Sequence, residues 1–570
     1  MTVKSNDQRI DAKAPTQNNL HGLQGCRNQF VCRRHLISSS EMATASQSLE
    51  GGATRAWNEV NPWLVAIAVM TSTFMEVLDT TVVNVSLPHI AGSLSATTDE
   101  ATWALTSYLV ANAIILPMTG WLANFFGRKR LLLFSVIGFT ASSFLCGLAP
   151  TLPLLILFRC IQGACGGGLQ PLSQAILMEV FPPQDRGKAM GFWGLGIVVA
   201  PMLGPVLGGW LTDSYSWRWV FYINVPIGIL AVFLTSIFVF DPHYIKRSTA
   251  KIDFWGMGYL AIGIACLQIM LDKGQEDDWF SSNLIRTLCV FAVIGLGAFI
   301  IRELTTDHPI VDLSVFKIRT YATGVFLMTV LGFVLYGSTV LIPLLLQTLL
   351  GYPALQAGIA MLPRGLGSFV AMPAVGALLS KVKAHYLLVC GMLLGAFAMW
   401  RLSHLTLDVG YWNFFAALIW QGVGMGLIFI PLTTITNDPI PIERMGNATS
   451  IFNLMRNIGA SIGISMVQTI QIRHTQIHVN TLTANVTPTN LQAQGLVNGM
   501  KSMMVTQAGA DPATAQRMAN GMVENIIRQQ AALMSFNDVF WLLAVMFLAM
   551  LPFVLLMRPP RKKAGAAMMH

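Results

Sequence analysis

Two carboxylates lie inside a stretch that otherwise has the composition of a membrane span. Glu76 and Asp79 stand three residues apart near the end of an apolar run that begins near Trp63. A carboxylate in lipid is costly, so an acidic residue kept there is a candidate for function. The spacing puts both side chains on one helix face, where two buried carboxyls exchange protons as a unit. We therefore predict a proton-coupling site at Glu76 and Asp79. The structural alternatives are a helix–helix hydrogen bond for Asp79 and a water-facing rim position for Glu76.

A second apolar segment, FRCIQGACGGGLQPLSQ at 158–174, contains an arginine. Lipid cannot solvate a polar helix face, so such a face should point at a cavity or at a neighbouring helix. We assign Arg159 to the proton-coupling site, where its charge opposes protonation, and place Gln162 and Gln170 in a substrate cavity. A structural Arg159 that caps a neighbouring helix is the alternative. Steps of three and four residues put on one helix face Arg159, Gln162, Gly166, Gln170 and Ser173.

The composition indicates that these residues belong to a membrane protein with many spans. Of 570 residues, 54% are hydrophobic and 11% are charged, and the mean hydropathy is +0.58, whereas soluble domains carry about 25% charged residues. A net charge of +9 then reflects loops at one membrane face, not a nucleic-acid surface. Residues 1–56 are polar and basic without the apolar core of a signal peptide, so we expect a disordered cytoplasmic tail there.

Fourteen segments are long and apolar enough to cross a bilayer, which takes about 20 residues. We therefore expect an all-α membrane protein with fourteen transmembrane helices. The segments lie near 63–86, 102–124, 131–149, 153–177, 188–211, 219–240, 254–272, 284–303, 322–349, 355–380, 386–404, 412–435, 447–470 and 537–557.

Basic residues in the connections predict the orientation. With the N-terminus inside, the even-numbered connections hold fourteen Lys and Arg residues, and the short odd-numbered ones hold three. This bias places both termini, including the tail 558–570, in the cytoplasm. The last outer connection, about 471–536, is too long to count under this rule.

The chain repeats itself at a nearly constant shift. PMTGWL at 117–122 matches PAVGAL at 373–378, and QGACGGGLQP at 162–171 has a looser echo in QGVGMGLIFIP at 421–431, at offsets of 256 and 259. The shift predicts two six-helix bundles, 57–240 and 304–557, with two inserted spans in 241–303. Paired bundles of this kind form transporters whose substrate site lies between them. Leu418 takes the place of Arg159 in the second bundle, so we assign proton handling to the first.

The connection GWLANFFGRKR at 120–130 has the residues of a tight cytoplasmic turn. Gly120 and Gly127 permit close approach, and Arg128 and Lys129 can bind helix ends or carboxylates. We assign these four residues to gating. A plain basic anchor at the inner face is the alternative.

Small residues also follow a four-residue step along GIVVAPMLGPVLGGW at 196–210. Such a stripe favours close helix packing, and prolines remove backbone donors and bend a helix. We predict a gating helix that packs tightly and flexes; generic packing is the alternative. The stripe and its prolines are Gly196, Ala200, Pro201, Gly204, Pro205, Gly208 and Gly209.

Together these motifs resemble three signatures of the major facilitator superfamily, the third being its antiporter signature. LDTTVVNVSLP around Asp79 is similar to the first-span motif of the fourteen-span drug:proton antiporter branch, the EmrB/QacA type. LQIMLDKGQEDDWFSS (267–282), FYINVPIG (221–228) and PLTTITNDPIP (431–441) resemble EmrB-type inner-membrane subunits of Gram-negative tripartite efflux pumps. The resemblance covers about 57–560. The chain departs from the family at Asn124 and Phe125, where an acidic and a basic residue are usual, so an Asp–Arg gate cannot be assumed.

The resemblance implies a proton-driven multidrug efflux antiporter of the bacterial inner membrane. Its expected partners are small-molecule drugs, protons and the lipid membrane, with no nucleic acid. Loop 471–536, in which we expect a helix at 512–530, is expected to bind a periplasmic adaptor (membrane fusion) protein that leads to an outer-membrane channel. A disordered spacer is the alternative. Asn84, Asn112, Arg364 and Arg456 are further candidates for the substrate cavity.

Other function classes have less support in the sequence. The ten histidines are scattered, so neither a membrane enzyme nor a metal site is expected, and Cys26 and Cys32 lack partners at zinc spacing. No P-loop occurs, and no cofactor is expected. A channel is disfavoured by the antiporter-like stripe. An exporter of a siderophore, lipid or metabolite from the same family remains the competing hypothesis.

Overall fold

The computed structural model describes residues 61–241, 253–306, 309–407, 410–487, 489–509 and 511–557. These residues form helices and connections, and no strand occurs among them. The two terminal tails expected at 1–56 and 558–570 lie outside the described residues.

The first six spans form one bundle. Local sequence starts its first helix cleanly, because the Asn61 side chain accepts from Trp63 N at 3.0 Å and Pro62 occupies the first turn, where a missing N–H costs nothing. The helices of this bundle are α2 (Pro62–Ser93), α3 (Thr98–Ala101), α4 (Trp103–Phe126), α5 (Arg128–Leu148), α6 (Leu152–Gly166), α7 (Leu169–Val180), α8 (Arg186–Ser214), α9 (Trp219–Tyr222) and α10 (Asn224–Phe238).

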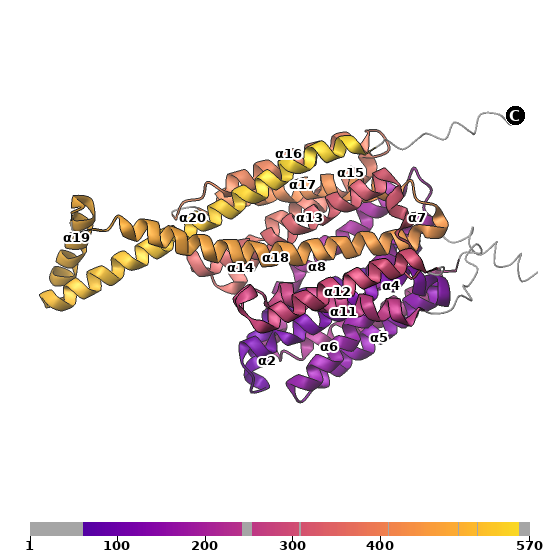
Figure 1. Cartoon of the computed structure of the whole chain (residues 1–570), viewed down its shortest axis with the longest axis horizontal. Coiled ribbons are helices and arrows are strands. Elements are labelled where there is room, and N and C mark those ends of the chain that lie inside the picture. Colours follow the sequence, from indigo (N-terminus) through magenta and orange to yellow (C-terminus); the bar gives the residue numbers. More distant parts are fainter. Residues whose placement is uncertain are drawn as a thin grey trace, which may run out of the picture. The chain divides into compact units, whose positions relative to one another are not determined.

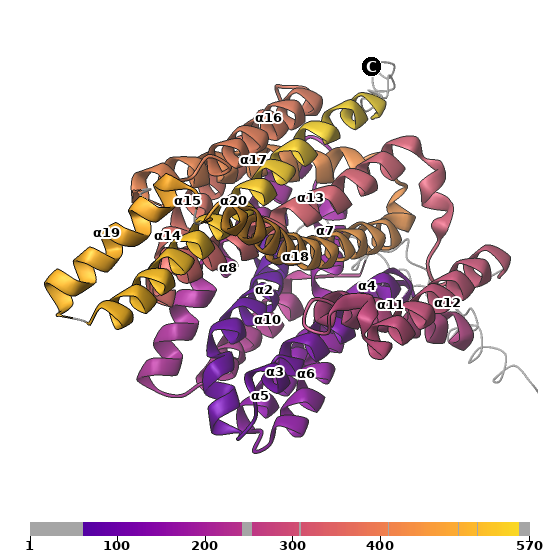
Figure 2. The same cartoon turned by 60° about the vertical axis from the view of Figure 1, so that its left-hand side comes forward.

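Two inserted helices follow. They are α11 (Phe254–Lys273) and α12 (Asn283–Thr305), with short turns η1 (Trp279–Ser281) between them and η2 (Leu313–Lys317) after them. Helix α11 packs on α12, on α4 and on α18 of the second bundle, and Figure 2 shows α12 at the margin beside α11. The inserted pair therefore lies against the side of the two bundles.

The last six spans form the second bundle, which also carries the long outer connection. Its helices are α13 (Arg319–Leu344) with η3 (Leu345–Leu349), α14 (Ala354–Ala360), α15 (Leu362–Leu378), α16 (Ala384–Leu402), α17 (Tyr411–Asn437), η4 (Ile442–Arg444), α18 (Met445–Ala484), α19 (Leu491–Ala508) and α20 (Pro512–Leu556).

Thirteen spans in the described part of the chain are long and apolar enough to cross a membrane. Helix α18 is the fourteenth expected span, and it falls short because its first turns carry buried polar residues, among them Asn447, Thr449, Asn453 and Arg456. A helix enclosed by other helices can carry such residues, since it does not face lipid. The prediction of fourteen spans in two six-helix bundles with two inserted helices is confirmed.

Helix contacts in the two bundles correspond to each other. In the first, α2 packs on α8, α4 on α6, and α10 on α5; in the second, α13 packs on α18, α15 on α17, and α20 on α16. Between the bundles, α8 packs on α15, and α4 packs on α18. In the sequence repeat, α4 corresponds to α15 and α8 to α18. The contact of α8 with α15 is therefore the repeat-related counterpart of the contact of α18 with α4. The repeat is therefore an approximate twofold relation between the bundles.

The long outer connection forms a helical hairpin, which we define as residues 471–536. Helices α18 and α20 run on beyond the bundles and α19 packs on α20, so the hairpin projects from one end (Figure 1). The Asp511 side chain caps α20 by accepting from Thr514 N at 3.0 Å. The helix expected at 512–530 lies within α20, and α18 and α19 make most of the remaining described hairpin helical as well. The disordered-spacer alternative is therefore wrong for the described part of the hairpin.

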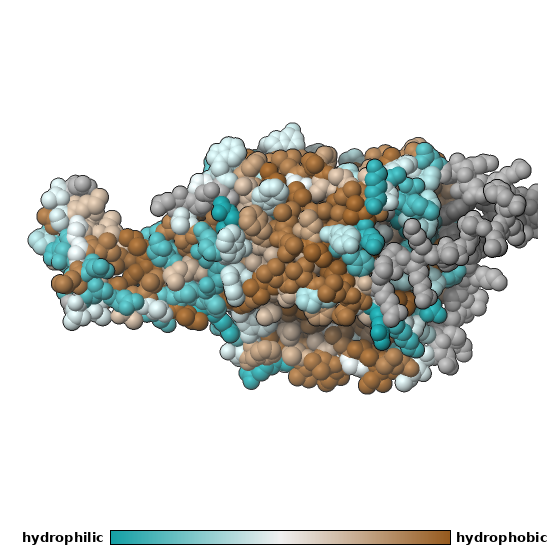
Figure 3. All heavy atoms as spheres, turned by 90° about the horizontal axis from the view of Figure 1, so that it is seen from above, coloured by the Kyte–Doolittle hydropathy of each residue, from teal (hydrophilic) through white to brown (hydrophobic). Residues whose placement is uncertain are grey.

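The surface has an apolar band between two polar rims (Figure 3). Large apolar side chains exposed on the spans include Phe134, Ile229, Val293 and Phe369. A broad band of this kind is what a lipid-facing surface requires. The chain is therefore a multi-pass membrane protein.

Candidate functional site

Asp79 lies in a closed polar cluster inside the first bundle. Its carboxylate accepts hydrogen bonds from Arg159 Nη1 at 2.6 Å, Gln162 Nε2 at 3.0 Å and Asn224 Nδ2 at 2.7 Å. Asp79 and Arg159 form an ion pair in which both side chains are fully buried. Three hydrogen-bond donors from α6 and α10 thus stabilise the negative charge of Asp79, which lipid could not solvate.

Arg159 is also tied to its surroundings. Its Nε donates to Ala104 O at 3.0 Å and its Nη1 donates to Gln162 Oε1 at 2.8 Å. Its guanidinium lies 4.2 Å from the Tyr108 ring centroid, an arrangement that stabilises a desolvated cation. Asp79 and Arg159 are therefore held as a pair within one bundle.

Glu76 faces a different direction. Asn112 Nδ2 donates to its Oε1 at 3.1 Å, and among the described residues its buried Oε2 has no hydrogen-bond partner. Gln170 and Arg456 lie next to this carboxyl, and Arg456 Nη2 donates to Gln170 Oε1 at 2.5 Å. Glu76 therefore lies where α2, α4 and α7 of the first bundle meet α18 of the second.

Glu76 and Asp79 have different hydrogen-bond partners, and no hydrogen bond joins them among the described residues. Their action as one proton-exchanging unit stays a prediction. Three residues on a helix turn through roughly 300°, which leaves enough divergence for the two side chains to reach different neighbours. Asp79 reaches α6 and α10, whereas Glu76 reaches α4 and α7. The two carboxyls therefore have different surroundings on one helix.

The polar face expected along 159–173 is also divided. The helix breaks between α6 and α7 at Gly167 and Gly168, so residues on the two sides of the break face different partners. Gln162 joins Asp79, Gln170 meets Arg456, and Ser173 Oγ donates to Val69 O at 3.1 Å.

A seam of polar contacts joins the bundles along α7 and α18. Besides the Gln170–Arg456 bond, Asn453 Nδ2 donates to Gln174 Oε1 at 2.6 Å, and Thr449 Oγ1 donates to Pro171 O at 3.1 Å. We call these three contacts the α7–α18 seam. The sequence analysis did not predict Gln174, Asn453 and Thr449. Their role depends on the packing of α7 against α18, and sequence periodicity does not reveal which helices pack together.

Asn224 was also not singled out in the sequence. It stands in FYINVPIG, and its side chain bonds both Asp79 and Ser143, the latter at 3.0 Å. Asn224 could have been found from the sequence, because a single asparagine in an apolar span needs a buried polar partner.

Two of the cavity candidates stay outside the network. Asn84 is exposed on α2. Arg364 on α15 is half-buried, lies near Tyr336, and has a buried Nη1 without a hydrogen-bond partner within the described part of the chain. Asn112, Gln162, Gln170 and Arg456 are the four candidates that join the polar contacts described above.

Glycines close the end of the bundles opposite the hairpin, which we call the basic-loop end. A Cβ on Gly120 of α4 would lie 2.7 Å from Asn447 Cα of α18, and a Cβ on Gly376 of α15 would lie 2.7 Å from Gly187 O of α8. Gly120 and Gly376 are the repeat-related glycines of PMTGWL and PAVGAL. The bundles thus meet backbone to backbone at two equivalent places.

Charged residues support this closure. Arg186 Nη1 lies 3.4 Å from Asp438 Oδ1 across the bundles. Within the first bundle, Arg128 pairs with Glu179, and Asp241 accepts from Lys129 N at 2.7 Å. Gly127 has φ +91°, which permits the tight turn between α4 and α5. The ion pair that crosses between the bundles is formed by Arg186 of α8 and Asp438 at the end of α17, whereas Arg128 and Lys129 of the 120–130 motif contact residues of their own bundle.

The stripe on α8 packs against α2. Cβ atoms on Gly196 and Gly208 would lie 2.9 Å from Met70 Cγ and 2.7 Å from Val82 O, and Gly204 faces Thr81. Ala200 is fully buried, whereas Gly209 is looser, since a Cβ added there would lie 4.0 Å from its nearest neighbour, Val85 Cγ1. Pro201 and Pro205 lie inside a helix that continues through them. Close packing is as expected, and flexing stays a prediction.

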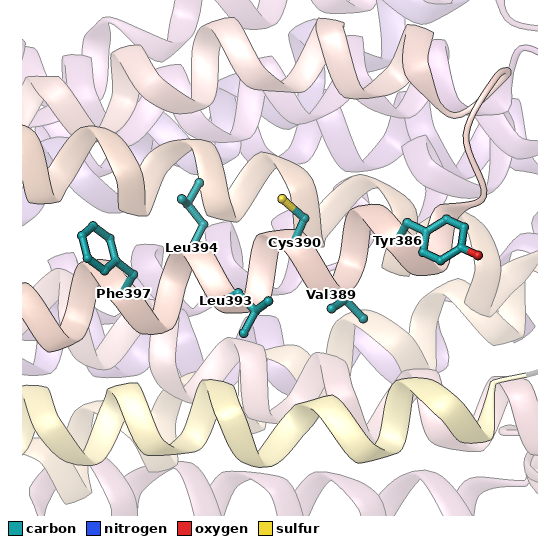
Figure 4. A pocket seen from close by; sticks show the side chains of 6 residues that line it. All are labelled: Tyr386, Val389, Cys390, Leu393, Leu394 and Phe397. Carbon is teal, nitrogen blue, oxygen red and sulfur yellow. The ribbon is translucent and has the colours of Figure 1, made fainter.

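An open apolar groove runs along the outer face of α16 (Figure 4). Its lining comes from that single helix and includes Tyr386, Cys390 and Phe397. Tyr386 and Phe397 are exposed on the apolar surface. The groove is a lipid-facing feature and contributes nothing to the polar network.

Comparison with known sequences decides the family. The Major Facilitator Superfamily profile matches residues 69–464. The chain belongs to the major facilitator superfamily. It is 40% identical to the multidrug export protein EmrB of Haemophilus influenzae over 499 residues, 87% of this chain and 96% of the relative. It is 39% identical to EmrB of Escherichia coli K12, covering 88% and 96%. It is 37% identical to the fatty acid resistance protein FarB of Neisseria gonorrhoeae, covering 90% and 98%.

Two solved transporter structures share the fold. The human organic anion transporter MFSD10 aligns with a TM-score of 0.54 at 13% identity, covering 85% of this chain and 99% of that one. The proton:xylose symporter XylE aligns with a TM-score of 0.54 at 15% identity, covering 86% and 94%. The major facilitator fold and the EmrB-type family expected from the motifs are confirmed.

Proposed function

We propose that this chain is a proton-driven multidrug efflux antiporter that exports lipophilic toxic compounds by alternating access between its bundles. The observation that carries the proposal is the Glu76 carboxyl, buried beside the α7–α18 seam with one oxygen unpartnered among the described residues. The substrate class is supported by relatives named multidrug export proteins at 40% and 39% identity. The proposed activity is transport and not catalysis.

Proton exchange is assigned to Glu76, with Asp79 and Arg159 as a fixed charged pair beside it. Protonating Asp79 would leave Arg159 as a buried cation without its counterion, which is strongly unfavourable. Protonating Glu76 removes a charge from a site where Asn112 donates a hydrogen bond and no ion pair at contact distance among the described residues is broken. Glu76 is therefore the carboxyl that can change its charge with least rearrangement.

The position of Glu76 links its charge to bundle movement. An ionised Glu76 attracts the Arg456 guanidinium on the opposite bundle, and a protonated Glu76 does not. Proton loading would thus weaken the α7–α18 seam and favour a different arrangement of the bundles. Each proton that crosses inward gains roughly 2.3 kcal/mol per 100 mV, which is available to export substrate.

The basic-loop end is assigned to the cytoplasm of a bacterium, and the hairpin to the outer side of its inner membrane. The excess of Lys and Arg in the even-numbered connections supports this orientation. The glycine contacts and the Arg186–Asp438 pair then close the cytoplasmic side. The conformation corresponds to the stage at which substrate cannot enter from the cytoplasm.

The hairpin is assigned to docking of a periplasmic adaptor protein that leads to an outer-membrane channel. Its helices hold apolar side chains away from the bundles: Leu491 is 83% exposed, and Leu496, Met503, Met518 and Met522 are exposed as well. Apolar groups projecting on helices suit a helical partner.

A second candidate function is export of fatty acids or related lipids. The relative FarB, 37% identical over 90% of this chain, is named for fatty acid resistance. The buried Arg364 Nη1, which has no partner within the described part, could meet a carboxylate head group.

Everted membrane vesicles with an imposed pH gradient test the proposal. Addition of a lipophilic cationic dye or of a fatty acid should release protons from vesicles that contain the wild-type protein. Glu76→Gln should abolish that flux, whereas the exposed hairpin substitution Glu524→Gln should leave it unchanged. Substrate-driven flux that persists in Glu76→Gln would contradict the proton site, and response to the fatty acid alone would select the second candidate.

A further inference from the structure

Two histidines and an aspartate converge where the hairpin leaves the bundles. His474 and His478 stand one turn apart on α18, and Asp538 lies on α20. His474 Nδ1 and His478 Nε2 each lie 2.8 Å from the same oxygen, Asp538 Oδ2. The three donor atoms all lie within 4.8 Å of one another.

We propose that His474, His478 and Asp538 bind a divalent transition-metal ion, with Zn²⁺ as the best match. Two imidazoles and one carboxylate are a donor set that Zn²⁺ accepts, at about 2.0–2.2 Å from each ligand atom. Ligands placed tetrahedrally at that radius stand about 3.3 Å apart. The observed N–O distances are 2.8 Å, and all three donor atoms lie within 4.8 Å of one another, so side-chain adjustments of about 1 Å would bring them to that spacing.

The imidazoles favour this class of ion over the common hard cations. Ca²⁺ and Mg²⁺ prefer oxygen ligands, whereas nitrogen ligands suit Zn²⁺, Ni²⁺ and Cu²⁺. The site is also open to solvent, with His474 and Asp538 side chains each 42% exposed and His478 20% exposed. An ion can reach it, and water can complete the coordination.

The surrounding contacts hold the ligands in place. Ser535 Oγ donates to Gln471 O at 2.5 Å, one turn before the ligands on both helices. Asn537, next to Asp538, donates to Leu405 O at 3.1 Å in the connection after α16. The two helices are thus fixed to each other and to the bundle, and ligands on such fixed elements need little ordering to bind.

A bound ion would clamp the base of the hairpin. It would join α18 to α20 by three coordination bonds, at the level where both helices leave the bundle. The direction in which the hairpin projects would then depend on metal. The metal site is defined by the geometry of the cluster, so it does not depend on the transport activity.

Binding of Zn²⁺ to the purified full-length protein tests the proposal. The protein is prepared without a polyhistidine tag, treated with a chelator, and titrated in competition with a chromophoric zinc ligand. We expect one ion per chain in the micromolar range or tighter, with Mg²⁺ failing to compete. His478→Gln and Asp538→Asn should each weaken binding by about 100-fold or more, since even the partners of metal ligands are worth roughly 10- to 100-fold.

His89→Gln is the matched control, because His89 lies 4.0 Å from Asp213 in an exposed pair with a single imidazole. It should leave the affinity unchanged. Equal Zn²⁺ affinity in the wild type and the three variants, or no saturable binding to the wild type, would overturn the proposal. The cluster would then consist only of two hydrogen bonds between histidine and Asp538.

A second measurement covers the case in which a variant fails to fold. Zn²⁺ should protect His474 and His478 of the wild-type protein from acylation by diethylpyrocarbonate, read by mass spectrometry, while exposed His89 and His404 stay reactive. Protection of all four histidines alike, or of none, would contradict a site at this position.

Discussion

The amide of Gln421 donates a hydrogen bond to the Ser338 hydroxyl at 2.8 Å, in the place where Gln162 bonds Asp79 in the first bundle. Both pairs are related by the same shift of 259 residues, from 79 to 338 and from 162 to 421. Leu418, fully buried, occupies the position of Arg159. The second bundle therefore contains an uncharged version of the Asp79 cluster.

That uncharged version predicts how the ion pair can be replaced. Asp79→Ser or Arg159→Leu alone leaves a buried charge unpaired, which typically costs about 3–5 kcal/mol, so each should lower the thermal stability and yield of purified protein sharply. The double variant Asp79→Ser/Arg159→Leu copies the second bundle and should recover most of that loss. A double variant as unstable as the sum of the singles would show that the pair is not coupled.

Much of the fold follows from sequence, because apolar length and basic connections identify spans one at a time. Helix α18 was also expected from apolar length, at 447–470, although buried Asn453 and Arg456 make it less apolar than the other spans. The partners of each polar residue could not be predicted in this way. Whether Asp79 pairs with Glu76 or with Arg159 depends on how α6 and α10 pack against α2, and helical spacing does not contain that information.

The glycine contacts at the basic-loop end predict a shift in conformation. Gly120→Ala places a Cβ 2.7 Å from Asn447 Cα, and overpacking of this kind costs about 1–3 kcal/mol, so the closed arrangement should lose roughly 5- to 150-fold in population. Spin labels at positions 130 and 443, in a cysteine-free background, should report a longer distance in this variant. Gly258→Ala, with nothing within 4 Å of its added Cβ, is the control and should behave as wild type.

The Arg186–Asp438 pair predicts a smaller effect on the same equilibrium. Its partners are 9% and 32% exposed, so the pair contributes about 1 kcal/mol, and Asp438→Asn should reduce closure roughly fivefold. The exchange Arg186→Asp/Asp438→Arg should restore closure, measured with the same pair of labels. If the exchanged variant opens as far as the single one, the ion pair does not hold the end closed.

If the hairpin binds an adaptor, its removal should affect drug resistance of cells without affecting proton flux in vesicles. Replacing residues 480–530 by a short Gly-Ser linker keeps the bundles and the base of the hairpin, so substrate-driven proton flux in everted vesicles should be unchanged. Resistance of intact cells should fall to the level of cells without the transporter, because the adaptor would have no docking surface. Unchanged resistance would rule out adaptor docking through this segment.

Proton release from purified protein tests most directly whether Glu76 exchanges the proton that is coupled to transport. In weakly buffered detergent solution, saturating substrate should displace a proton from the wild-type protein, because substrate and proton favour different arrangements of the α7–α18 seam. The release should be absent in Glu76→Gln and retained in Asp79→Ser/Arg159→Leu. Equal proton release from Glu76→Gln and wild type would contradict the account.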